Sequence, residues 1–220
     1  MTDKIATVLQ NRNGIFFQPN ETVPFTGLKV FWHQNGQKLF EENYKDGKQD
    51  GLLAGWFENG QKQIERQYID GQSSGLMIGW FENGQKESEF NFKDDKQDGL
   101  STFWFENGQK KAEINFKDGQ QDGLATEWFE NGQKKEEGNY KDGQQNGLVT
   151  VYFGSGQKKA EFNFKDDKQD GETTVYSESG YRKSSSFFKD GELTMKTEFF
   201  HDGQKILKMT AFIDGQPLDF

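Results

Sequence analysis

The sequence predicts an all-β protein, an elongated single-layer antiparallel meander of repeated β-hairpins. The motif Glu-Asn-Gly-Gln-Lys, or a close variant, returns every 24 residues, and a second turn signal, Asp followed mostly by Gly, keeps the same period. Hydrophobic residues make up only 31% of the chain, but aromatic residues reach 15%. A thick aliphatic core is therefore excluded, and aromatic rings must supply most of the buried area. The two turn columns are Gly36, Gly60, Gly84, Gly108, Gly132, Gly156 and Gly180, and Asp46, Asp70, Asp94, Asp118, Asp142, Asp166, Asp190 and Asp214.

One repeat, residues 51–74, illustrates how each hairpin is expected to form. The segments Leu52–Glu58 and Gln61–Ile69 have the length of strands, and Asn59-Gly60 separates them. Asn-Gly is typical of a two-residue type I′ turn, because both central residues of that turn need positive φ. The Asp-Gly segment between repeats is then expected to reverse the chain into the next hairpin.

Alternation along the strands assigns the side chains to two faces. With a two-residue turn, Phe57 faces Lys62 and Gly55 faces Ile64, which puts the Phe57 and Tyr68 columns on one face. The other face carries a Trp column with a Leu column and a Glu column beside it. A three-residue turn would instead slip the register by one residue and move the Tyr/Phe column onto the Trp face; we favour the two-residue turn. Ladders of like rings are expected to join adjacent hairpins.

The repeat boundaries predict three parts without a linker. Residues 1–26 are expected to form an N-terminal capping hairpin, residues 27–194 seven hairpin repeats, and residues 195–220 a degenerate C-terminal capping repeat. The pattern decays toward the end, where Ser155, Ser177 and Ser185 replace repeat residues and Gly203 falls one residue early. Such decay suits an outer strand that faces water.

The repeated residues resemble a known family. Trp56–Lys62, with Glu65, Tyr68 and Gly75-Leu76, look like the bacterial variant of the MORN repeat found in YwqK-like antitoxin proteins, and Pro24–Gly27 is similar to the usual start of such arrays. The resemblance covers about residues 15–216. It implies a hairpin array with a non-catalytic protein-binding role, antitoxin or immunity binding of a partner protein being the family's usual label. The alternative is a structural scaffold or a cell-surface, adhesin-like repeat protein.

Charge and composition exclude several partners. The net charge is −9 and the pI about 4.9, with both signs interspersed in every repeat. Nucleic acid is disfavoured because its recognition needs a basic stripe, and binding to an anionic membrane surface is disfavoured for the same electrostatic reason. The chain has no cysteine, so it has no disulfide or thiol chemistry. Residues 1–13 lack a long apolar run, which predicts a cytoplasmic protein, or a secreted or surface protein if a leader has been removed.

No catalytic constellation is found, so we expect no enzyme and no cofactor. The two histidines, His33 and His201, fall in repeats at opposite ends of the array. Asp94, Asp98 and Gly99 resemble the start of a calcium-binding loop, but Lys96 stands where an oxygen ligand is required. Plain turn chemistry explains these residues, and no metal site is expected.

The Trp column is the candidate binding site. Regularly spaced rings can dock the apolar residues of a partner protein, because Trp and Tyr dominate binding hot spots. The same rings could instead only stabilise a thin sheet, and the two roles are compatible. A homodimer through two such faces is also expected. The candidate residues are Trp56, Trp80, Trp104, Trp128 and Tyr152.

Overall fold

The computed structural model describes residues 8–199, 206–213 and 215–218. Within these residues every regular element is a β-strand. Contacts divide the chain into two compact units, Met1–Gly108 and Gln109–Phe220. We treat each unit by itself.

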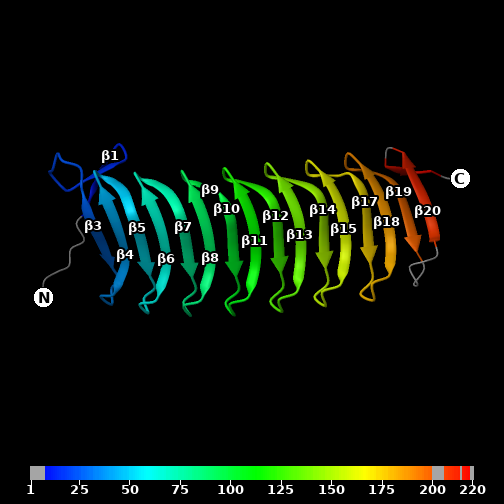
Figure 1. Cartoon of the computed structure of the whole chain (residues 1–220), viewed down its shortest axis with the longest axis horizontal. Coiled ribbons are helices and arrows are strands. Elements are labelled where there is room, and N and C mark those ends of the chain that lie inside the picture. Colours follow the sequence, from blue (N-terminus) through cyan, green and yellow to red (C-terminus); the bar gives the residue numbers. More distant parts are fainter. Residues whose placement is uncertain (1–7, 200–205, 214, 219–220) are drawn as a thin grey trace. The chain divides into compact units, whose positions relative to one another are not determined.

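The first unit holds a small hairpin and a larger sheet (Figure 1). The hairpin pairs β1 (Gln10–Arg12) with β2 (Ile15–Phe17). In the sheet each strand is antiparallel to the next, and β8 pairs with both β9 and β10. The strands of the sheet are β3 (Gly27–Trp32), β4 (Lys38–Lys45), β5 (Lys48–Trp56), β6 (Lys62–Ile69), β7 (Gln72–Trp80), β8 (Lys86–Lys93), β9 (Lys96–Gln97) and β10 (Gly99–Trp104).

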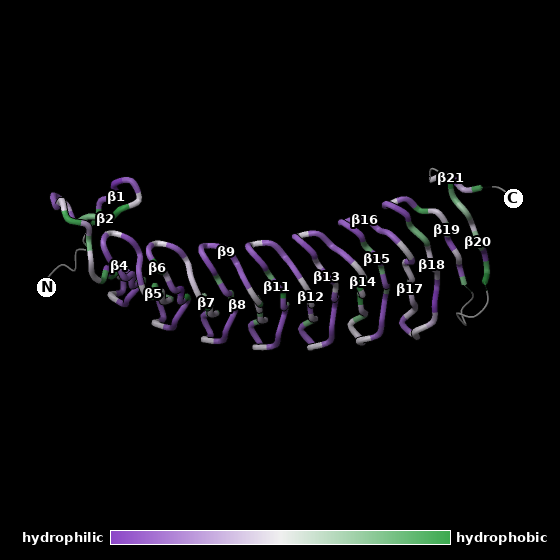
Figure 2. The backbone as a smooth tube through the Cα atoms, turned by 45° about the horizontal axis from the view of Figure 1, so that its top comes forward, coloured by the Kyte–Doolittle hydropathy of each residue, from purple (hydrophilic) through white to green (hydrophobic). Residues whose placement is uncertain are grey.

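The second unit repeats this pattern. Its strands also pair antiparallel with their neighbours in chain order, and β15 pairs with both β16 and β17. In both units the strands form one layer (Figure 2), which confirms the predicted all-β meander of hairpins. The strands are β11 (Lys110–Lys117), β12 (Gln120–Trp128), β13 (Lys134–Lys141), β14 (Gln144–Tyr152), β15 (Lys158–Lys165), β16 (Lys168–Gln169), β17 (Gly171–Tyr176), β18 (Arg182–Lys189), β19 (Glu192–Phe199), β20 (Ile206–Ile213) and β21 (Gln216–Pro217).

The Asn-Gly turn differs from the predicted two-residue turn. The Phe57 N–H donates to the Gln61 carbonyl at 2.9 Å, and the Gly60 N–H donates to the Phe57 carbonyl at 2.9 Å. These bonds define a three-residue loop, a type I turn followed by a glycine at φ 84°. Such a loop needs positive φ only at the glycine, so Asn59 is spared the left-handed conformation that a type I′ turn would impose.

The two-residue turns lie at the opposite ends of the strands, where one hairpin connects to the next. Lys45 pairs with Lys48, and the two residues between them, Asp46 and Gly47, have φ of 49° and 77°. Positive φ at both positions is the type I′ geometry. The sequence-based assignment was therefore wrong about which turn column takes which geometry.

A β-bulge preserves the predicted faces despite the longer loop. Trp56, not Phe57, pairs with Lys62, so the predicted pairing of Phe57 with Lys62 is wrong. Gln63 is the extra residue of the bulge, and the next pair is Gly55 with Ile64, as predicted. The inserted residue cancels the slip that a three-residue loop would otherwise cause.

The sheet of each unit thus has two distinct faces. The Trp face carries the Trp column and, along the same strands, Leu52 and the Ala54–Glu65 pair. The Tyr face carries Gly55, Ile64 and the Tyr68 column. Deep burial is rare and falls mainly on small side chains, such as Ala54 at 5% exposed, because a single layer cannot enclose a core.

Candidate functional site

The Trp rings of the first unit are joined from repeat to repeat by lysines. The Lys38 ammonium lies 5.5 Å from the Trp56 ring centre, and Lys62 lies 5.8 Å from that of Trp80. Lys86 stands in the same relation to Trp104, at 5.6 Å. Each indole is half-buried and its face attracts the ammonium of the preceding repeat.

These lysines replace the predicted ladders of like rings. Like positions in consecutive hairpins are two strand spacings apart, about 10 Å, whereas ring pairs need centroids within about 7 Å. The ring contacts inside the sheet of the first unit therefore join unlike columns, as with Phe90 and Phe103 at 5.2 Å. The predicted like-to-like ladder is wrong for this geometric reason.

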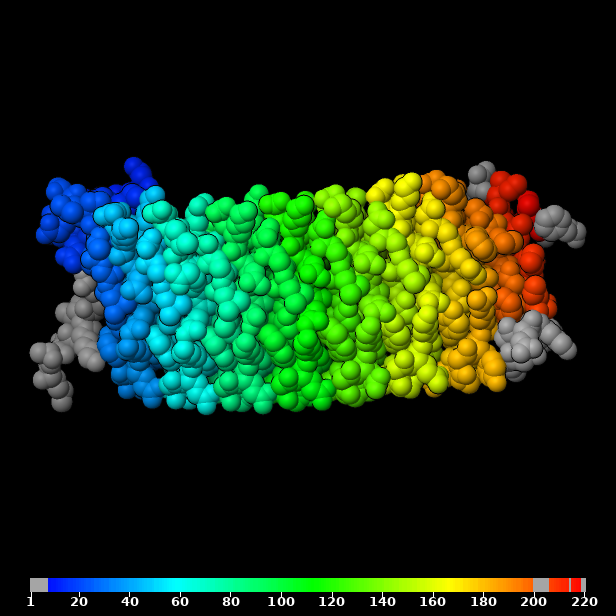
Figure 3. Space-filling view, in the orientation of Figure 1, coloured from blue at the N-terminus to red at the C-terminus, as the bar shows by residue number. Residues whose placement is uncertain are grey.

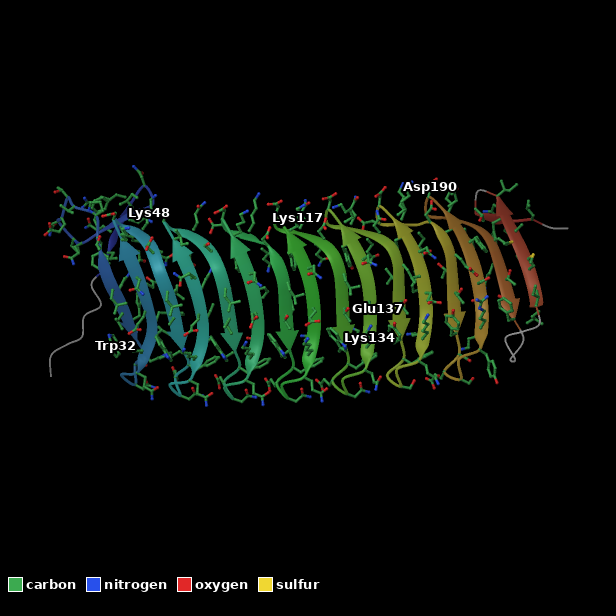
Figure 4. All side chains as sticks on the ribbon, viewed as in Figure 1. Trp32, Lys48, Lys117, Lys134, Glu137 and Asp190 are labelled. Atoms are coloured by element: carbon green, nitrogen blue, oxygen red, sulfur yellow. The ribbon has the colours of Figure 1, made fainter. Side chains whose placement is uncertain are left out.

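Each of these lysines also binds a glutamate three residues later. Lys86 and Glu89 are 2.6 Å apart. Residues three apart in a regular strand point to opposite faces, so the bulge is what brings the pair together. Figure 4 labels one pair, Lys134 and Glu137, on β13. The other pairs are Lys38–Glu41, Lys62–Glu65, Lys110–Glu113 and Lys158–Glu161.

In the second unit two tyrosines occupy the Trp column. The Tyr152 hydroxyl donates to Glu137 at 2.6 Å, and the Tyr176 hydroxyl donates to Glu161 at 2.5 Å. Burial, followed by the bond to Glu137, raises the pKa of Tyr152 to about 12. Hydrogen bonds from Lys134 and then from Tyr152 lower the pKa of Glu137. The polar links of this face therefore also run between repeats.

The exposed apolar surface of the Trp face consists of leucines. The five predicted site residues are all half-buried. Trp56, Trp80 and Trp104 lie in the first unit, and Trp128 and Tyr152 lie in the second. The leucines beside them are 41–51% exposed. In the space-filling view the side chains of successive strands form bands that follow chain order within each unit (Figure 3). The exposed leucines are Leu28, Leu52, Leu76, Leu100, Leu124 and Leu148.

Both turn edges are also linked from repeat to repeat. The Asn59 side chain accepts from the Gln61 N–H at 2.9 Å and donates to the Glu82 carbonyl at 3.2 Å. At the opposite strand ends of the first unit, where Figure 4 labels Lys48, the Gly71 N–H donates to the Gln49 carbonyl at 2.7 Å. The turn residues thus serve the architecture. Among the described residues no group of three or more metal-binding side chains converges.

Of the two histidines, His33 lies within the described residues. The His33 ring nitrogen Nε2 lies 2.9 Å from the Trp56 carbonyl, in the next hairpin. His201, Gly203 and Asp214 lie outside the described residues. Within the described chain no helix is long and apolar enough to span a bilayer.

Sequence reasoning missed a cavity on the Tyr face of the first unit. It has a volume of about 450 Å³, and its lining includes Leu53, Ile64, Arg66 and Met77. One signal in the sequence could have found it: glycines stand at 55 and 79, in the interior of strands, where other repeats carry large side chains. Glycine inside a strand often marks a place of close approach.

The geometry defines a class, namely a solenoid-like array of β-hairpins held together by contacts between neighbouring repeats. A family model described as a MORN repeat variant matches residues 25–46, 74–94, 97–118, 121–142 and 145–166. The protein is therefore a MORN-variant repeat protein. A comparison with curated proteins found no match.

Proposed function

We propose that this protein is a non-catalytic protein-binding module whose Trp face contacts a partner protein. The observation that carries the proposal is the Leu column, 41–51% exposed beside the half-buried rings. Isolated exposed leucines need no explanation, but these leucines recur on one face from repeat to repeat, alternating with Asn or Gln of the paired strands, and so offer a partner a regular series of apolar contacts. In each unit the rings lie on the same face as the leucines and supply further contacts, Trp56, Trp80 and Trp104 in the first unit and Trp128 and Tyr152 in the second.

The resemblance to YwqK-like proteins supports an antitoxin or immunity role for that binding. In such a role the module neutralises a partner by covering its surface, so no chemistry is required of the module. An array of exposed apolar contacts on a rigid sheet suits this task, because little side-chain ordering is needed on binding.

The experiment compares partner capture by the wild-type chain and by a triple variant. Leu52→Thr, Leu76→Thr and Leu100→Thr remove the exposed leucines of this part of the first unit and introduce β-branched residues, which favour strands. We expect at least a tenfold loss of the partner recovered from the source cell, with the sheet signal in circular dichroism retained. A control variant, Val23→Thr with Ile69→Thr, changes residues that are 70% and 54% exposed and lie outside the column.

Recovery that is equal for the triple variant and the wild type would contradict binding through this face. The antitoxin role has its own readout: expression of the captured partner alone should arrest growth. Co-expression of the wild-type chain should restore growth, and the triple variant should not. Self-association is measured in the same series by sedimentation, and a dimer lost in the triple variant would identify a second copy as the occupant of this face.

A further inference from the structure

The two faces of the first unit differ in how closely the repeats agree. On the Trp face the Trp and Glu columns return at each step, as with Trp56, Trp80 and Trp104, although the row of Ala54 changes to Ile78 and Thr102. On the Tyr face the row across β4 to β8 reads Phe40, Gly55, Ile64, Gly79 and Ser88. The next row reads Glu42, Leu53, Arg66, Met77 and Phe90. These rows repeat no residue type from one hairpin to the next at equivalent positions except the glycines.

The cavity lies beside Gly79, one of the two glycines in these rows. Neither Gly55 nor Gly79 has positive φ, so the backbone does not require glycine at either place. A Cβ at Gly55 would come within 2.5 Å of the Phe40 ring, and one at Gly79 within 2.8 Å of the Ser88 hydroxyl. The space above Gly55 is therefore filled by the Phe40 ring and Ile64, whereas Gly79 lines the cavity and has only the Ser88 hydroxyl at close range. The cavity of about 450 Å³ falls in the size range of binding pockets.

Arg66 provides a fixed cation at this cavity. Its Nε donates to the hydroxyl of Ser73 at 2.7 Å, and Ser73 is only 1% exposed. The guanidinium carbon lies 5.1 Å from the Tyr68 ring and 4.9 Å from the Phe92 ring, which are consecutive members of one column. The side chain is thus held between two rings by contacts on three sides.

This cation is not neutralised within the described part of the chain. No carboxylate of residues 8–199, 206–213 or 215–218 forms an ion pair with Arg66. Glu87 also lines the cavity but forms no ion pair with it. A half-buried guanidinium with its Nε already engaged presents its terminal N–H groups as a planar fork, the geometry that matches a carboxylate.

We propose that the Tyr face of the first unit binds an extended segment of a partner protein in which a large apolar side chain is followed by Asp or Glu. The apolar side chain enters the cavity beside Gly79, against Leu53, Ile64 and Met77. The carboxylate accepts hydrogen bonds from Arg66. The positive charge of Arg66 favours an acidic occupant. A single-layer sheet covers the cavity on one side only, so the open side favours an extended segment that lies across the sheet. The proposal concerns a different face from the Leu column and does not rest on it.

The test is a titration of the full chain, with isotope-labelled Ile, Leu and Met methyl groups, by two peptides. The probe is acetyl-Gly-Gly-Phe-Asp-Gly-Gly-amide, and the matched peptide has Asn in place of Asp. We expect saturable shifts at Leu53, Ile64 and Met77, with the Asp peptide binding at least tenfold more tightly. Arg66→Gln should abolish that preference. Arg12→Gln is the matched control, because Arg12 also stacks on a ring, that of Phe17, at 4.6 Å.

Two further variants keep the test decisive. If Arg66→Gln does not fold, Arg66→Lys retains the charge without the fork and should reduce the preference for Asp several-fold. Gly79→Val fills the part of the cavity beside this residue and should weaken both peptides equally. The Leu52, Leu76 and Leu100 variant should leave peptide binding unchanged, which separates this proposal from binding through the Trp face.

Several outcomes would overturn the proposal. They are the absence of saturable shifts, shifts confined to the Leu column, equal affinity for the Asp and Asn peptides, or a preference that survives Arg66→Gln. Tighter binding of 3-phenylpropionate than of the Asp peptide would also overturn it, since the site would then belong to a small carboxylate ligand and not to a protein segment.

Discussion

The Trp face and the Tyr face belong to the same strands, but the lysine contacts that recur from repeat to repeat lie on the Trp face, whereas two rows of the Tyr face change from one repeat to the next. On the Trp face, Lys62 meets both Glu65 and the Trp80 of the following repeat. Because each lysine contacts the Trp of the following repeat, neither residue can change without the loss of that contact. The contact therefore favours the same two residues in every repeat. On the Tyr face, contacts such as that of Arg66 with Ser73 occur in one place. The contacts that recur in each repeat therefore serve the architecture, and the two varied rows of the Tyr face can form a site that occurs once.

Two adjacent residues of β13 show the same difference in their electrostatics. Glu137, on the Trp face, has its pKa lowered by hydrogen bonds from Lys134 and Tyr152. Glu136, on the Tyr face, has its pKa raised, chiefly by burial and then by Glu127, against a smaller opposing effect of Lys135. Neighbours in sequence thus have opposite shifts because alternate strand residues point to opposite sides.

The largest expected effect on stability comes from substitutions on β7. Trp80 and Met77 are both half-buried and lie on opposite faces of this strand. Trp80→Leu removes the ring that Lys62 covers and should lower the free energy of unfolding by about 2 kcal/mol. Met77→Leu conserves volume and should lower it by less than about 1 kcal/mol. Denaturant titration measures both, and equal losses would show that the Trp face is not the one that joins the repeats.

A smaller effect is expected from two hydroxyl deletions in the second unit. Tyr152→Phe removes the 2.6 Å bond to Glu137 on the Trp face and should cost about 1 kcal/mol. Tyr140→Phe, on the Tyr face, removes only a 3.1 Å bond from Gln145 and should cost about 0.5 kcal/mol. The comparison is made by thermal unfolding at pH 7, where a larger loss for Tyr140→Phe would reverse our ranking of the faces.

The smallest expected change in stability comes from replacing Glu137 or Glu136 by Gln, and the two changes have opposite signs. The folded-state pKa of Glu137 lies below the ordinary value of 4.5, so its stabilising contribution is present above pH 4.5 and is lost as the pH falls through the folded pKa. Glu137→Gln should therefore destabilise the protein at pH 7, by less than about 1 kcal/mol since the pair is partly screened by solvent. This difference should shrink below pH 4.5.

Glu136 behaves in the opposite way. Its folded-state pKa lies above 4.5, so the charged form destabilises the fold at neutral pH, and protonation relieves that penalty as the pH falls through the raised pKa. Glu136→Gln should stabilise the protein at pH 7 by less than about 1 kcal/mol, an effect that disappears in acid. Unfolding curves of both variants between pH 3 and 7 check the signs, and two shifts of the same sign would refute the assignment of faces.

The sequence was sufficient for the hairpin array and for the two faces, because the 24-residue period and strand alternation are properties of the chain alone. It was insufficient for the turns, since Asn-Gly and Asp-Gly both satisfy the rule for type I′ geometry. What distinguishes them is the bulge at Gln63, which allows a longer loop without exchanging the faces. No residue type at that position announces a bulge, so the outcome depends on the pairing of the whole hairpin.

The candidate site was only partly predictable for a related reason. The Trp column is visible as a repeated letter, but the lysine that covers each ring comes from the preceding repeat and becomes apparent only in three dimensions. Arg66 occurs in one repeat only, because the equivalent positions of the neighbouring repeats are Glu42 and Phe90. Its significance arises from Ser73, Tyr68 and Phe92, which surround it only once the strands are paired.

The links between repeats have a fixed span and direction. Asn59 reaches forward 23 residues to Glu82, and Lys62 reaches forward 18 residues to Trp80. A gene duplication that inserts one whole period into either unit therefore supplies every partner that the new segment needs, whereas an insertion one codon longer or shorter displaces all of them together. Evolution can lengthen such a protein in whole modules, and each added copy is then free to diverge on the side that carries none of these links.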